Sequence, residues 1–141
     1  DMGEQAPLPR PKVQIRRPST ILMQNIDGVR RYGVVAMTSK FSEAGAYRQR
    51  MYEAICRQWY LLLERQSYSA RDTGAFVHIK FSVDKQGNLL DAKVAETSAS
   101  QPATTICLDS VISRAPFGPW TQEMIDLLGE STEVEIRFHY R

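Results

Sequence analysis

The stretch GAFVHIKFSVDKQGNLLDAKVAE, residues 74–96, decides the fold of this chain. Residues 75–83 alternate between apolar and mixed positions, which is the period of a strand with one buried face. The buried face holds every second residue: Val77, Ile79, Phe81 and Val83. A glycine-containing turn at 84–88 follows, so residues 89–96 return as an antiparallel strand. On this strand we expect Leu90, Ala92 and Val94 to face the core.

Helical patterns flank this hairpin. Residues 46–64 form an apolar stripe at helical spacing: Tyr47, Met51, Ile55, Trp59 and Leu62. A second helix is expected over 103–115 with these buried positions: Ile106, Cys107, Val111 and Ile112. Pro116 ends it, and a short amphipathic turn follows over 122–128. Residues 132–140 alternate again and form the last strand.

The element order is therefore helix, strand, strand, helix, strand. This order predicts an α+β fold with two layers, in which two helices cover one face of a three-stranded antiparallel sheet. If the last crossover skips one position, strand 75–83 is central and strands 89–96 and 132–140 are the edges. The β-branched and aromatic face of strand 75–83 suits the central place.

The N-terminal part has a different character. Residues 1–18 contain four prolines among basic residues, which favours an extended linker end: Pro7, Pro9, Pro11 and Pro18. Residues 19–46 place Asp27-Gly28 between apolar runs, which predicts a hairpin or a segment packed against the domain. We therefore divide the chain into 1–18, 19–46 and 47–141. Because it opens at Asp1 without an initiator Met, we expect a longer protein, and the Pro-rich residues 1–18 indicate that another part is tethered upstream.

Composition and charge exclude several function classes. The 141 residues have an ordinary globular composition, and no apolar run is long enough for a membrane-spanning helix. The net charge of +2 is too small to indicate nucleic acid as a partner. No catalytic or phosphate-binding motif is present, so we expect no enzyme and no cofactor. His78 and His139 should share the uncovered sheet face without a third ligand, so we expect no metal site.

The last strand is the candidate binding element. An edge strand presents unpaired backbone N–H and C=O groups, which an extended peptide can use to join the sheet. The alternative is that its charged side chains blunt the edge. The candidate residues are Glu133, Val134, Glu135, Ile136, Arg137, Phe138, His139 and Tyr140.

The ordered set of motifs resembles the C-terminal domain of TonB proteins, and more distantly that of TolA. A helix ends near Trp59, a D-x-x-G hairpin follows at Asp84–Gly87, and a helix with Cys107-Leu108-Asp109 leads to Ala115-Pro116-Phe117-Gly118-Pro119-Trp120. The resemblance covers residues 47–141. Two features depart from the family pattern: residues 97–100 replace its usual loop, and Gly118 stands where a second proline is common.

This resemblance implies a periplasmic domain tethered to the inner membrane by an N-terminal helix outside this sequence. Its last strand would pair with the plug peptide of an outer-membrane TonB-dependent transporter, in siderophore or nutrient uptake. An ExbB/ExbD-type motor would act through the upstream region. A TolA-like envelope linker remains an alternative, as does a non-catalytic cell-wall or pilus-associated module. Further expected partners are a second copy of this chain, bound through the edge strand, and peptidoglycan.

A periplasmic location also changes the interpretation of the cysteines, because disulfides persist there. Cys56 and Cys107 lie on the two expected helices over one sheet face. A bridge between them would close a loop of ~50 residues, worth about 4 kcal/mol in the chain-entropy model. The alternative is two buried thiols.

Overall fold

The computed structural model describes residues 19–21, 27–39, 45–66, 68 and 72–141. The expected linker end, residues 1–18, lies outside them. The described strands are β1 (Ser19–Ile21), β2 (Gly33–Ser39), β3 (Phe76–Asp84), β4 (Leu89–Thr97) and β5 (Ser131–Tyr140). The described helices are α1 (Asp27–Tyr32), α2 (Gly45–Arg65), α3 (Gln101–Ile112) and α4 (Gln122–Leu128). None of these helices is both long and apolar enough to cross a membrane.

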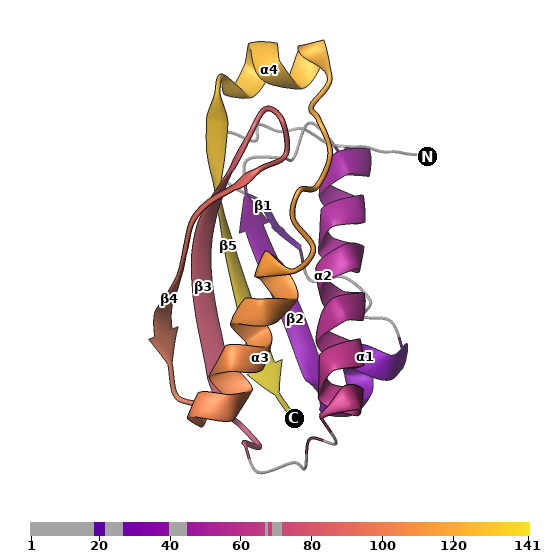
Figure 1. Ribbon diagram of the computed structural model, residues 1–141, viewed down its shortest axis with the longest axis vertical. Coiled ribbons are helices and arrows are strands. Elements are labelled where there is room, and N and C mark those ends of the chain that lie inside the picture. The colour runs from indigo at the N-terminus through magenta and orange to yellow at the C-terminus, as the bar shows by residue number, and fades with distance from the viewer. Residues whose placement is uncertain (1–18, 22–26, 40–44, 67, 69–71) are drawn as a thin grey trace, which may run out of the picture.

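One antiparallel sheet contains all five described strands, in the order β1-β2-β5-β3-β4 (Figure 1). The prediction that the first hairpin strand separates the other two is confirmed, because β3 lies between β4 and β5. The prediction of three strands is wrong. Residues 19–21 and 33–39 extend the sheet on the far side of β5.

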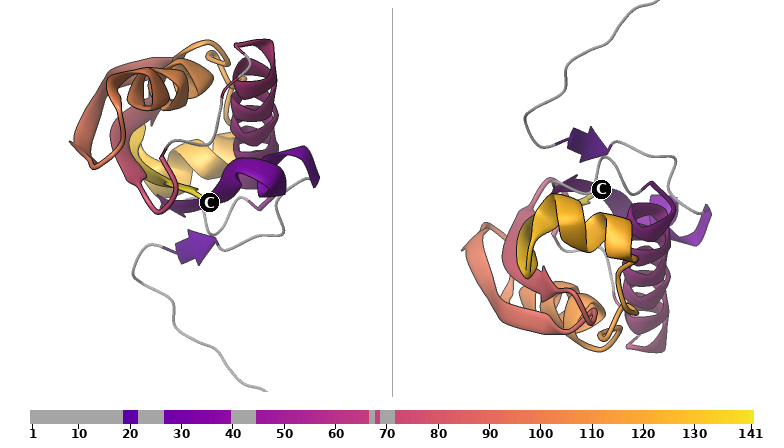
Figure 2. Two further views of the ribbon diagram at one scale, coloured as in Figure 1. Left: turned by 90° about the horizontal axis from the view of Figure 1, so that it is seen from below. Right: turned by 90° about the horizontal axis from the view of Figure 1, so that it is seen from above.

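The helices α2 and α3 cover the same face of the sheet, as both views in Figure 2 show. The expected α+β architecture of two layers is therefore present, with α4 at one end (Figure 1). Trp59 lies at the centre of the core and is fully buried. Its ring centroid is 5.1 Å from that of Phe138 and 5.3 Å from that of Tyr140, so α2 packs directly on β5.

The carboxylate of Asp84 stabilises the hairpin turn between β3 and β4. Asp84 Oδ1 accepts hydrogen bonds from the backbone N–H groups of Gln86 and Asn88, both at 2.9 Å. The turn is also bonded to the segment after α3, since the Trp120 N–H donates to the carbonyl of Lys85 at 2.9 Å. The predicted turn at 84–88 is thus confirmed and is fixed from two sides.

Strand β4 is irregular, and this corrects the predicted face of Leu90. Lys80 pairs with Lys93 and Ser82 pairs with Leu90, so residues 91 and 92 both lie opposite Phe81. Asp91 takes a left-handed backbone with φ of 52°. This β-bulge reverses the alternation, since an extra residue shifts every side chain before it to the other face. Leu89 consequently packs against the core and Leu90 is 39% exposed.

Two other local predictions are wrong. Asp27-Gly28 begins helix α1 and does not form a hairpin turn. Both a turn and a helix start accept these residue types, so the pair alone could not decide between them. Helix α3 ends at Ile112, whose side chain is 45% exposed and not buried as expected.

Helix α3 begins at a buried polar cluster. Asp72 accepts hydrogen bonds from the Ser100 N–H at 2.7 Å, the Ser100 hydroxyl at 3.0 Å and the Tyr68 hydroxyl at 2.7 Å. Ser100 is the N-cap of α3. Because a buried carboxylate needs such donors, this cluster fixes the start of α3 against the chain segment before β3.

Candidate functional site

Strand β5 contains all eight predicted binding residues in one continuous run. Four side chains point into the core and are buried: Val134, Ile136, Phe138 and Tyr140. The other four alternate with them on the uncovered face: Glu133, Glu135, Arg137 and His139. The predicted alternation of this strand is therefore confirmed.

The predicted edge position of β5 is wrong. Its one side pairs with β3 from Ser131 to His139, and its other side pairs with β2 from Val134 to Tyr140. The sequence predicted a hairpin or a packed segment over residues 19–46, which include β2, but it did not predict that β2 pairs with β5. The backbone groups proposed to receive a partner peptide are thus already used by residues 33–39 of the same chain.

Strand β2 shows what the β5 side accepts. It runs antiparallel, with Gly33 opposite Tyr140 and Ser39 opposite Val134. Val35 and Met37 are fully buried, and the Tyr52 hydroxyl of α2 donates to the Val35 carbonyl at 2.8 Å. This side of β5 therefore pairs with a seven-residue strand whose apolar side chains occupy alternate positions.

Gly33 marks the tightest point of that pairing. A Cβ atom at this position would lie 1.8 Å from the backbone oxygen of His139 and 3.2 Å from Cη2 of Trp59. Since no side chain fits there, only glycine allows β2 to reach full register with the end of β5.

The outer edges of the sheet differ in kind. On one side β1 pairs with only residues 37–39 of β2. On the other side β4 is the outermost strand, and two register shifts interrupt its pairing with β3. Bulges and charged residues such as Lys93 and Glu96 hinder edge-to-edge pairing, so β4 is a protected edge.

The uncovered face beside β5 is a mixed network of charges. His78 Nε2 lies 3.1 Å from Glu135 Oε1, and an Arg137 Nη2 lies 3.4 Å from His78 Nδ1. The Arg137 guanidinium also lies 4.8 Å from the ring centroid of Phe76. Partial burial lowers the pKa of His139, and the charge of Arg137 adds to this shift. His78 and His139 share this face as predicted, but they contact different groups.

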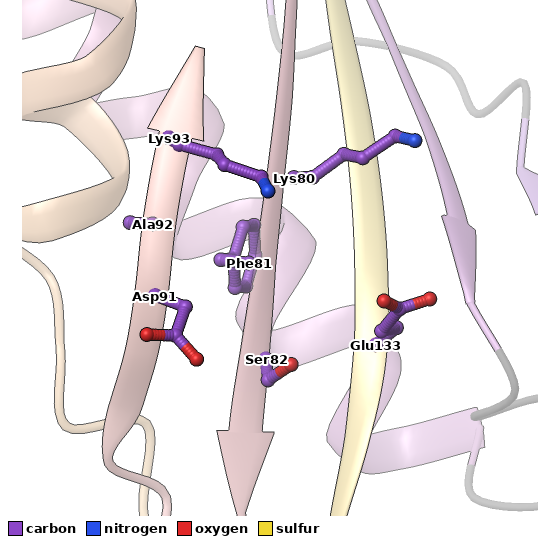
Figure 3. A pocket seen from close by; sticks show the side chains of 7 residues that line it. All are labelled: Lys80, Phe81, Ser82, Asp91, Ala92, Lys93 and Glu133. Carbon is purple, nitrogen blue, oxygen red and sulfur yellow. The ribbon is translucent and has the colours of Figure 1, made fainter. Parts of the chain in front are cut away.

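A depression of about 530 Å³ opens on the same face at the β4 bulge (Figure 3). Seven residues from β3, β4 and β5 line it: Lys80, Phe81, Ser82, Asp91, Ala92, Lys93 and Glu133. The lining carries two cationic and two anionic side chains, so it favours no charge sign. Among the described residues, no group of three His, Cys, Asp or Glu is arranged to hold a metal ion.

The cysteines are free in this structure, which is the second of the two alternatives, a pair of buried thiols. Both Cys56 and Cys107 are buried thiols. Cys107 Sγ lies 3.4 Å from the hydroxyl of Tyr140, whose own proton goes to the Ala103 carbonyl at 2.8 Å. Burial raises the pKa of each thiol to about 12. Neutral thiols are poor nucleophiles, so these side chains act as packing groups.

Comparisons with known proteins found little. No family model and no curated protein matches this sequence. A solved structure that is similar is the NMR solution structure of the TonB C-terminal domain of Helicobacter pylori. It is 17% identical, the match covers 71% of this chain and 92% of that chain, and the TM-score is 0.39. The resemblance to TonB C-terminal domains therefore rests on the sequence motifs quoted above.

Proposed function

We propose that this chain is the periplasmic, receptor-engaging domain of a TonB-type energy transducer. It is a non-catalytic module that takes up an extended plug peptide of an outer-membrane transporter beside β5. One observation carries the proposal: the β5 side from Val134 to Tyr140 already accepts an antiparallel strand over seven residue pairs. The ordered motifs of residues 47–141 are the second support.

The incoming peptide takes the place of β2. Replacing β2 exposes Val35 and Met37, each of which contributes roughly 1.5–3 kcal/mol by burial. A peptide with apolar side chains at the same two sites restores this contribution. The proposal thus defines the ligand: an extended segment, antiparallel to β5, with apolar residues two positions apart.

Strand β2 is the strand best placed to leave. Among the residues that the structure describes, its outer side pairs only with the three residues of β1. By contrast, β3 pairs with β5 over nine residues on one side and also pairs with β4 on the other side. Exchange at β2 therefore leaves the β4-β3-β5 core of the sheet and the α2 and α3 layer in place.

An amide NMR titration of the chain with transporter plug peptides tests this proposal. We expect shift changes in β5 at 134–140 together with changes in β2 at 33–39, because the peptide releases β2. Scrambled peptides of the same composition serve as controls. Shift changes confined to other elements, or equal changes with scrambled peptides, contradict strand exchange.

A matched pair of glycine variants sharpens the test. Gly33→Ala places a methyl group against the His139 carbonyl and loosens β2, so the plug peptide should bind more tightly. Gly45→Ala is the control, since a Cβ there meets no atom within 4 Å. A folded Gly33→Ala variant that binds the peptide no better than Gly45→Ala would show that β2 does not compete for the site.

A further inference from the structure

A second surface lies on the helical side of the molecule, away from the uncovered face of the sheet. The outer face of α2 and the segment after α3 form a groove of about 360 Å³. Its helical residues recur at helix spacing on one face of α2: Arg50, Glu53, Ala54, Arg57, Gln58 and Leu61. Arg114, two residues after the end of α3, closes it, and α3 lies beside α2 in Figure 1.

The groove carries an excess of positive charge. Arg50, Arg57 and Arg114 are exposed, and none of them forms an ion pair with any residue that the structure describes. Arg50 lies over the Tyr47 ring at 5.5 Å from its centroid. The one acidic residue of the lining, Glu53, accepts a hydrogen bond from Gln49 Nε2 at 2.7 Å. Three guanidinium groups therefore face solvent around a single carboxylate.

The groove also has an apolar end. Leu61 is 49% exposed and lies one helical turn beyond Arg57. Arg50 and Arg57 are two turns apart, which separates them by about 10 Å along the helix axis. In an extended peptide the same distance spans about three residues. A ligand that follows the groove thus needs carboxylates at such a spacing and an apolar side chain beyond them.

We propose that this groove is a docking site for an acidic segment of a partner protein, with carboxylates on Arg50, Arg57 and Arg114 and an apolar residue on Leu61. Charge complementarity identifies the ligand, because guanidinium groups bind carboxylates in paired hydrogen bonds. The site does not depend on the proposed function at β5, since it uses neither that strand nor β2. One domain could hold both partners at once.

The composition of the chain argues against its own N-terminal segment as the occupant. Residues 1–18 contain four basic and two acidic residues, so the groove would repel them: Arg10, Lys12, Arg16 and Arg17 against Asp1 and Glu4. A planar membrane surface would not follow a concave groove between α2 and the segment after α3. A protein segment meets both the shape and the charge of the groove.

Fluorescence anisotropy with the full chain and a labelled synthetic peptide tests this inference. The peptide carries glutamate at every third position and one leucine at its end, and a lysine-for-glutamate peptide is its control. We expect the acidic peptide alone to bind. The double variant Arg57→Glu/Arg114→Glu should lose at least about tenfold in affinity and should instead bind the lysine peptide.

The matched control is Arg65→Glu/Lys93→Glu, which changes the net charge equally at exposed positions outside the groove. It should bind the acidic peptide within about twofold of the native chain. Leu61→Ala should weaken binding without changing its salt dependence. If both double variants lose the same affinity for the acidic peptide, net charge alone explains the binding and the proposal is overturned.

Two further outcomes would also overturn it. If the native chain is a dimer in analytical ultracentrifugation and Arg57→Glu/Arg114→Glu is a monomer, the occupant is a second copy of this chain. If phosphatidylglycerol vesicles bind through Arg57 and Arg114 while the acidic peptide does not bind, the occupant is a lipid surface. Neither result bears on strand exchange at β5, which the plug-peptide titration tests separately.

Discussion

Cys56 and Cys107 illustrate how burial sets the chemistry of a side chain in this domain. Each thiol lies in the core, and desolvation raises its pKa to about 12. The ordinary pKa of a cysteine thiol is 9.0. Because the folded pKa is the higher one, their stabilising contribution is complete below about pH 9 and is lost as the pH rises toward 12.

We expect no reaction of either thiol with Ellman's reagent in the native protein at neutral pH. Two thiols should react in guanidinium chloride without a reductant. The physical reason is that thiolate is the reactive form and burial suppresses it. A count of zero in denaturant would instead establish a Cys56–Cys107 bridge.

At the scale of elements, the bulge in β4 rests on one backbone conformation. Asp91 has φ of 52°, a region that β-branched residues almost never adopt. Asp91→Val should therefore destabilise the domain by about 1–2 kcal/mol, whereas Asp91→Gly should be neutral or stabilising.

Urea unfolding with an unchanged m-value measures this effect. Lys93→Val is the control on the same strand and should stay within about 0.5 kcal/mol of the native protein. Equal tolerance of valine at positions 91 and 93 would contradict a left-handed residue at 91.

Hydrophobic periodicity predicted the helices and strands whose own sequence shows one continuous apolar face. The alternation around Val77 and Ile79 and the stripe through Trp59 predicted β3 and α2 close to their observed bounds. The face of Leu90 could not be predicted in this way. It depends on the backbone of Asp91, and one inserted residue reverses every position before it.

Partner choice between strands was the other missing information. The alternation at Val35 and Met37 is compatible with a strand, but it does not say which strand it joins. Whether β5 is an edge is decided by residues 95 to 107 positions away along the chain. For the candidate site, the sequence therefore predicted the strand 132–140 and its buried and uncovered faces. It did not predict that β2 already pairs with one side of this strand.

At the scale of the whole molecule, the sheet has unequal parts. Among the described strands, β2 has one full-length neighbour, while β3 has two. Native-state hydrogen exchange should give the slowest amides of β2 a smaller opening free energy than those of β3, with a weaker dependence on denaturant. Identical values in both strands would mean that the sheet opens only as one unit and that β2 cannot leave separately.

The position of β1 and β2 along the chain has a mechanical consequence. They are the first two strands of the described chain, and β5, the strand with which β2 pairs, is the last. If the proposed transducer pulls on the domain from its N-terminal side, β1 and β2 bear the force before it reaches β3 or β4. Tension would then detach β2 from β5, so that the domain would bind its partner more tightly under load than at rest.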